Sequence, residues 1–113
     1  MHESVLARQL VNAVVERVPA GSQATRITGW LAETEALNGD SIQLHFDNLA
    51  KGTTAEGATL DLTLTHVRAK CEGCGEVYLP EHHLTVCPSC GSLDGTLLDR
   101  TGLGIESLEV RES

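Results

Sequence analysis

The sequence predicts an α+β fold in which two helices pack on a small three-stranded sheet, with a small domain inserted around four cysteines. Three observations support this fold class. Two segments carry the apolar periodicity of amphipathic helices, three segments read as strands, and both cysteine pairs stand before the last strand. Two helices on one face of such a sheet would bury both apolar patterns at once.

The first helix is expected over residues 4–18. Its apolar residues recur every four positions, and its polar residues fall on the opposite face. Pro19 and Gly21 follow the pattern and end the helix. The predicted apolar stripe consists of Leu6, Leu10, Val14 and Val18, flanked by Val11 and Val15.

The second helix is expected over about residues 41–51. The preceding turn, Asn38-Gly39-Asp40-Ser41, contains residue types that cap helices, and we expect Asp40 to be the cap. Gly52 suits the C-terminal end. The apolar side of this helix consists of Ile42, Phe46 and Leu49.

Strands are expected over residues 25–31, 58–67 and 104–111. The middle strand has the clearest pattern, because leucines alternate with polar residues along it. This alternation predicts a sheet with one covered face. The leucines are Leu60, Leu62 and Leu64, and the polar residues are Thr59, Asp61, Thr63 and Thr65.

The cysteines form two Cys-x-x-Cys knuckles, and twelve residues separate the pairs. This spacing can bring four thiolates to the corners of one tetrahedron, which is the geometry of a structural zinc site. A glycine follows each pair and allows a sharp turn beneath the metal. The spacer can close as a two-stranded hairpin through Pro80-Glu81. The predicted Zn(II) ligands are Cys71, Cys74, Cys87 and Cys90, and the glycines are Gly75 and Gly91.

We therefore expect a zinc-ribbon-like domain over residues 70–93, inserted into an α/β domain formed by residues 1–69 and 94–113. A redox dithiol and two disulfides are the alternative uses of four cysteines. A redox Cys-x-x-Cys normally opens a helix in a βαβ unit, and no such pattern surrounds either pair. One metal site uses all four cysteines and suits a reducing cytoplasm, where we expect the protein to act.

The bulk composition excludes several classes of function. The 113 residues include 8 basic and 16 acidic ones, so the net charge is −8 and a nucleic-acid partner is not expected. No apolar run is long enough to span a bilayer, and no secretory signal is expected. The sequence contains no phosphate-binding loop, no nucleophile–base pattern and no open zinc site, so an enzyme is not predicted.

The first three residues, Met1-His2-Glu3, form a second candidate metal site. The terminal amine of Met1, the first backbone amides and the imidazole of His2 lie within a few bonds of one another. Ni(II) and Cu(II) favour square-planar nitrogen donors and displace amide protons. Glu3 is expected to supply its backbone amide or to orient the imidazole with its carboxylate. A solvated terminal histidine is the alternative, and retention of Met1 is a hypothesis.

Three motifs in order give the chain a resemblance over essentially its full length. It begins Met1-His2-Glu3 and enters a helix directly. Its middle segment reads Lys51-Gly52-Thr53-Thr54-Ala55-Glu56-Gly57-Ala58, and its second knuckle reads Cys87-Pro88-Ser89-Cys90-Gly91-Ser92. The chain thereby resembles the HypA/HybF family of hydrogenase maturation factors, which are nickel metallochaperones.

The resemblance implies more than the spacing does. Family members bind Ni(II) at the N-terminus through His2, and four cysteines hold a structural Zn(II). They pass nickel to the hydrogenase maturation GTPase, and the metal then reaches the large subunit of [NiFe]-hydrogenase. Some relatives also serve urease through its accessory proteins. A zinc-ribbon adaptor for protein interaction or transcription, without nickel, is the alternative function, and a thiol redox enzyme is a third.

The chain departs from the family pattern at two places. The family often has Gly-Glu-Leu in the first strand, but here Gly29-Trp30-Leu31 stands there, with Glu33 and Glu35 shifted along. Some relatives carry histidines just after each knuckle, and this chain has none there. His82 and His83 are expected to be loop residues, and a transient nickel contact is the alternative for them. His45 and His66 are expected to be structural or surface residues.

Overall fold

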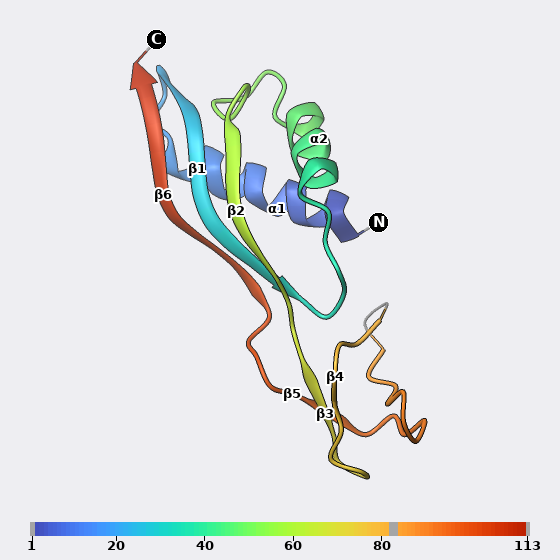
Figure 1. Cartoon of the computed structure of the whole chain (residues 1–113). Helices are drawn as coiled ribbons and strands as arrows, with labels where there is room; N and C mark the ends of the chain where they lie inside the picture. The colour runs from blue at the N-terminus through green and yellow to red at the C-terminus, as the bar shows by residue number, and fades with distance from the viewer. Residues whose placement is uncertain (1, 82–83, 113) are drawn as a thin grey trace. The chain divides into compact units, whose positions relative to one another are not determined.

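The computed structural model describes residues 2–81 and 84–112 (Figure 1). Contacts divide the chain into two compact units, residues 1–29, 38–63 and 105–113 in the first and residues 30–37 and 64–104 in the second. The elements in chain order are α1 (His2–Arg17), β1 (Ser22–Glu33), α2 (Gly39–Leu49), β2 (Thr59–His66), β3 (Ala69–Cys71), β4 (Val77–Tyr78), β5 (Gly95–Leu97) and β6 (Gly102–Glu112).

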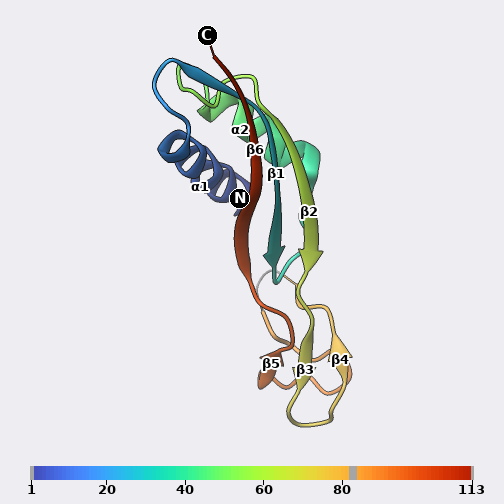
Figure 2. The ribbon, with the colours of Figure 1, turned by 90° about the vertical axis from the view of Figure 1, so that its left-hand side faces the viewer.

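The α+β fold class is confirmed. The larger sheet has the strand order β2-β1-β6, so the first strand of the chain lies at its centre and the last strand lies at one edge. Helix α1 runs across one face of this sheet, and α2 packs against α1 (Figures 1 and 2). The strands β3 to β5 belong to the segment between β2 and β6, where the insertion was predicted.

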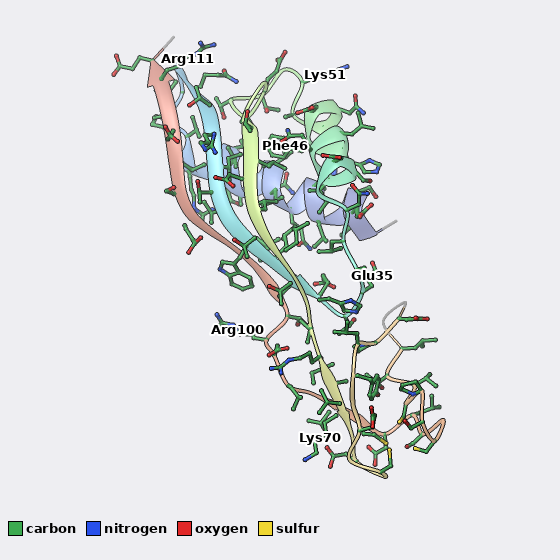
Figure 3. All side chains as sticks on the ribbon, in the orientation of Figure 1. Glu35, Phe46, Lys51, Lys70, Arg100 and Arg111 are labelled. Carbon is green, nitrogen blue, oxygen red and sulfur yellow. The ribbon has the colours of Figure 1, made fainter. Side chains whose placement is uncertain are left out.

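The core of the first unit joins both helices to the sheet. Phe46 lies between α2 and β2 (Figure 3). The apolar stripe of α1 is buried as predicted, whereas Val15 is 41% exposed and lies off the stripe. Burying large aliphatic and aromatic side chains in this way is the main favourable contribution to folding. The largest fully buried side chains of this unit are Leu10, Val14, Ile27, Ile42 and Phe46.

The start of α2 corrects the predicted cap. Asn38 is the N-cap, and its side chain accepts a hydrogen bond of 3.0 Å from the backbone N–H of Ser41. Asp40 lies instead in the first turn, where its negative charge suits the positive end of the helix dipole. An N-cap residue needs extended backbone angles and an oxygen that reaches a donor two or three residues on, and Asn38 has both.

The strands follow the predicted alternation and run beyond the predicted ends of the first and last ones. In β2 the leucines are half-buried and the intervening threonines and aspartate are exposed. Gln43 of α2 ties this strand to the helix, because its side chain accepts from the N–H of Leu60 at 2.8 Å and donates to the carbonyl of Ala58 at 3.2 Å. These bonds supplement the apolar contacts on the covered face.

A second sheet, β4-β3-β5, supports the cysteine segment. The spacer between the knuckles was expected to pair with itself through Pro80-Glu81. A bridge between Glu81 and Leu84 does reverse the chain there, but the strand partner of β4 is β3. Ala69 of β3 pairs with Tyr78 on one side and with Leu97 on the other. The predicted hairpin of the spacer is therefore limited to this bridge, and the main pairing of β4 is with the strand that leads into the first knuckle.

The predicted zinc domain, residues 70–93, lies inside the second unit, which also includes residues 30–37 and extends to residue 104. Arg68 and Asp99 help to close this unit, because three nitrogens of Arg68 donate to the Asp99 carboxylate at 2.9–3.0 Å. Assigning nickel to residues 1–69 and 94–113 stays a prediction. In the part of the chain that the structure describes, no helix is long and apolar enough to cross a membrane.

Candidate metal centres

The four predicted zinc ligands meet at one point. All four sulfur atoms lie within 4.8 Å of one another, and the structure records the cysteines as free thiols. The Sγ atoms of Cys71 and Cys90 are 3.6 Å apart, and those of Cys74 and Cys87 are 3.5 Å apart. A tetrahedral zinc with Zn–S bonds of about 2.3 Å requires sulfurs about 3.8 Å apart, so the cluster fits a structural zinc ion.

The same distances disfavour both alternative uses of the cysteines. A disulfide needs sulfurs about 2 Å apart, and a redox pair would join the two cysteines of one knuckle. Here two close sulfur contacts, of 3.5 and 3.6 Å, join one knuckle to the other. The arrangement is therefore that of a shared metal site.

The two knuckles repeat one backbone pattern. The N–H of Gly75 donates to the carbonyl of Cys71 at 2.9 Å, and the N–H of Gly91 donates to the carbonyl of Cys87 at 2.8 Å. Both glycines have positive φ angles, +82° and +75°, which side chains with a Cβ rarely adopt. The sharp turns expected at these glycines are confirmed, because each glycine N–H closes a turn on the carbonyl of the first cysteine of its knuckle.

The electrostatics of the free thiols favour a bound cation. Backbone N–H groups of Cys74 and Gly73 donate to the sulfur of Cys71 and lower the pKa of that thiol to about 6. The N–H of Glu76 lowers the pKa of the Cys74 thiol. The contact of the Cys74 thiol with the Cys87 sulfur, together with burial, outweighs this effect and raises the pKa of Cys74 to about 12. A cation bound by all four sulfurs would stabilise their thiolate forms.

Tyr78 is a residue of this centre that the sequence interpretation missed. It is 8% exposed and forms a buried cluster in the second unit with Ala69, Cys71 and Cys87. Burial first, and then the charges of the neighbouring cysteines, raise the pKa of Tyr78. A Cβ at Gly95 would overlap the Tyr78 hydroxyl, so the chain needs a glycine there. The signal in the sequence was the position of the single tyrosine, between the knuckles.

The N-terminal candidate site is described only in part. Met1 and the side chain of His2 lie outside the described residues, although the backbone of His2 begins α1. The carboxylate of Glu3 accepts a hydrogen bond of 2.6 Å from the backbone N–H of Asn38. This bond is the first cause of a lowered pKa at Glu3. Glu3 therefore holds the start of α1 against the start of α2.

These features point to one known family, and a model of that family matches nearly the whole chain. A family model described as "Hydrogenase/urease nickel incorporation, metallochaperone, hypA" matches residues 1–110. This chain belongs to the HypA family. HypA proteins are nickel-incorporation metallochaperones of hydrogenase maturation, and they are not catalytic enzymes. The family binds nickel and zinc, and the four-cysteine cluster fits its structural zinc site.

Individual HypA proteins match over nearly their whole length. The hydrogenase maturation factor HypA of Caldanaerobacter subterraneus is 33% identical over 114 residues, which cover 97% of this chain and 99% of that protein. The HypA of Nostoc sp. is 33% identical over 112 residues, covering 99% of this chain and 97% of its own. The solution structure of the Ni metallochaperone HypA from Helicobacter pylori has the same fold, with a TM-score of 0.55, 19% identity and 98% coverage of both chains.

The departure from the HypA pattern at Trp30 has a local structural role. The half-buried indole lies under the guanidinium of Arg100, whose central carbon is 5.5 Å from the ring centroid. A Cβ at Gly104 would overlap the indole, so β6 passes close to the ring only because a glycine stands there. Glu33 and Glu35 lie nearby along the chain, and His82 and His83 lie outside the described residues.

Proposed function

We propose that this chain carries Ni(II) as cargo for the maturation of [NiFe]-hydrogenase and binds it at its N-terminus. The nickel ligands in this proposal are the amine of Met1, the imidazole of His2 and a backbone amide at Glu3. Zn(II) is held for structure by Cys71, Cys74, Cys87 and Cys90. The observation that carries the proposal is the family match over residues 1–110, which includes both groups of residues.

The start of α1 supports nitrogen ligation by the terminus. The first N–H groups of a helix have no partner within the helix, so the amides of His2 and Glu3 are not needed for its hydrogen bonds. Ni(II) displaces amide protons to gain such donors. Because the Glu3 carboxylate already accepts from Asn38, we assign its backbone amide to nickel and its side chain to holding the terminus in place.

The two metal sites have opposite tasks in this proposal. Four thiolates saturate zinc and leave no position for exchange, so residues 70–93 act as a structural domain. A site at the end of the chain releases its metal readily, so residues 1–69 and 94–113 carry the cargo. The partners that we propose are the hydrogenase maturation GTPase, the [NiFe]-hydrogenase large subunit and urease accessory proteins.

The charge of the chain suits docking of these partners to a basic surface. With a net charge of −8, association with a basic patch is expected to accelerate at low salt. Cysteines bind zinc as reduced thiolates, and a reducing compartment keeps them so, which is why we propose that the protein works in the cytoplasm. Neither nucleic acid nor a membrane takes part in the proposed function.

The decisive experiment is a nickel titration of tag-free protein with its native N-terminus, beside His2→Ala and the control His45→Ala. A competing chelator suppresses weak binding, and metal analysis counts zinc in each protein. We expect one zinc in all three proteins and tight nickel binding in the native protein and in His45→Ala only. Intact mass checks that Met1 is retained, because its loss would move the amine and remake the site.

Two results would count against the proposal. Equal tight binding of nickel by native protein and His2→Ala would remove His2 from the site. Absence of tight nickel binding in the native protein, with zinc in place, would favour the alternative of a zinc-ribbon adaptor without nickel.

A further inference from the structure

A cavity in the second unit is lined by three side chains of a kind that binds metals, and the proposed function uses none of them. Its volume is about 370 Å³, and it lies among residues of one unit. Glu35 comes from the loop between β1 and α2 (Figure 3), and His66 ends β2. The lining residues are Glu35, Ala36, His66, Pro80 and Glu81.

The hydrogen bond made by His66 leaves one ring nitrogen able to bind a metal. Its Nε2 atom is 2.6 Å from the backbone carbonyl oxygen of Pro80. A carbonyl oxygen only accepts, so Nε2 carries the hydrogen, and Nδ1 of the neutral ring keeps its lone pair. Histidines that bind metals usually donate their other N–H to a carbonyl or a carboxylate in this way.

Rigid surroundings hold this ring. His66 is half-buried at the end of a strand, and Pro80, its partner, is fully buried. The residue after His66 is also fixed, because the N–H of Val67 donates to the carbonyl of Glu33 at 2.7 Å. The imidazole is therefore oriented before any metal arrives, which lowers the entropic cost of binding.

Two carboxylates complete a nitrogen and oxygen ligand set. Glu35 is half-buried and Glu81 is exposed, and both line the same cavity as His66. The backbone of Glu81 is held by the N–H of Leu84, which donates to its carbonyl at 2.9 Å. Imidazole with carboxylates suits divalent nickel, and zinc and cobalt also accept such ligands.

The site differs from the cysteine cluster in one important respect. Among the described residues, only the four cysteines already present their ligand atoms within 4.8 Å of one another. The carboxylate of Glu81 must therefore turn toward the ring when a metal binds, and Glu35, which already makes an interaction within the protein, must rearrange as well. Ordering two long side chains costs conformational entropy, so binding here is weaker and release is faster than at a preformed site.

We propose that His66, Glu35 and Glu81 form a second, weaker site for divalent nickel in the same unit as the zinc centre. This inference goes beyond the proposed function, because it needs neither Met1 nor His2. It also revises the expectation that His66 is only a structural or surface residue. A labile site of this kind holds an ion without competing with the terminus for tight binding.

The test uses full-length, zinc-loaded protein carrying His2→Ala, titrated with nickel(II) chloride alone in a calorimeter. We expect one weak binding event to remain. Adding His66→Gln should weaken it at least about tenfold, since a ligand is lost. The glutamine amide can still donate to the Pro80 carbonyl, so the fold is retained, and zinc content checks this. Adding Glu81→Gln, at an exposed position, should also weaken it, whereas His45→Gln should not.

Amide NMR spectra locate the ion. Ni(II) with nitrogen and oxygen ligands in octahedral geometry is paramagnetic, so it should broaden the amide signals of Ala36, His66 and Glu81. Unchanged weak affinity in both His66→Gln and Glu81→Gln would overturn the inference, and so would broadening confined to other residues. The outcome of the earlier titration, which tests tight nickel binding through His2, does not affect this test, because these proteins already carry His2→Ala.

Discussion

The two cysteines of each knuckle have different surroundings. Cys71 and Cys87 are 1% exposed and pack beside Tyr78, whereas Cys74 and Cys90 are exposed. The first cysteine of each pair is therefore a core residue as well as a predicted metal ligand. Losing it removes a thiolate and places a different group in a packed apolar environment.

Cys71→Ser should bind zinc less tightly and melt at a lower temperature than the native protein. A site with three thiolates loses affinity, and the binding free energy of a structural zinc is also folding free energy. Metal analysis and calorimetric melting measure both effects, with the exposed Ser89→Ala as the control. One tightly held zinc and an unchanged melting temperature in Cys71→Ser would show that Cys71 is not a ligand.

Asp99 and Arg68 provide a second residue-level test, through pH. The side chain and backbone of Arg68 lower the pKa of Asp99 from 3.8 to about 2. Because the pKa of Asp99 is lower in the folded state, its charged form stabilises the fold at pH values above the pKa of the unfolded state. This contribution is complete above 3.8 and is lost as the pH falls toward 2.

Asp99→Asn should therefore melt slightly below native protein near neutral pH, and the difference should shrink as the solution is acidified through this range. The effect is small because Arg68 is largely exposed to solvent. Thermal melts at matched zinc content measure it. Asp94→Asn, in the same unit, is the control, and an equal difference in both variants would contradict the role given to Asp99.

At the scale of elements, the start of α2 is hydrogen-bonded to the first turn of α1. The Asn38 side chain caps the helix, and its backbone N–H donates to Glu3 at the start of α1. One residue therefore terminates the loop from β1, begins α2 and contacts α1. The sequence pattern offered several capping residue types in a row, and only the backbone angles of Asn38 decided among them.

Asn38→Ala should lower the free energy of unfolding by about 1 kcal/mol, because the N–H of Ser41 loses its acceptor. The backbone bond to Glu3 does not depend on the substituted side chain. Denaturant unfolding measures the change, and Asn48→Ala, at an exposed position late in α2, is the control. If Asp40→Ala cost as much as Asn38→Ala, the capping role would not belong to Asn38 alone.

At the scale of the whole molecule, the two units have different sources of stability. Both helices belong to the first unit, which has an aliphatic core with Phe46 at its centre. The second unit contains the short strands β3, β4 and β5, and the buried cluster around the cysteines in it is small. Its stability is expected to depend on the metal, since so small a core supplies little hydrophobic free energy.

Removing zinc with a strong chelator should therefore unfold the second unit while leaving the first unit folded. Hydrogen exchange measures this, because amides of β3 and β5 should lose protection and amides of α1 and α2 should keep it. Helical circular dichroism should change little for the same reason. Loss of protection in α1 and α2 together with β3 would mean that the two units unfold cooperatively.

Local patterns in the sequence predicted both helices, the three longer strands, the class of fold and four candidate zinc ligands. These features follow from short-range patterns, namely the periodicity of Leu10 and Val14, the alternation around Leu62, and the two cysteine spacings. Each pattern constrains residues that are near one another in the chain. Local rules were therefore sufficient for them.

Which distant residues meet was established by long-range packing. It paired β3 with both β4 and β5, placed Tyr78 beside the thiols, and brought Arg68 to Asp99. It also set Glu35, His66 and Glu81 around one cavity. These contacts join segments far apart in sequence, and no periodicity or spacing encodes them, because they arise when packing brings the segments together.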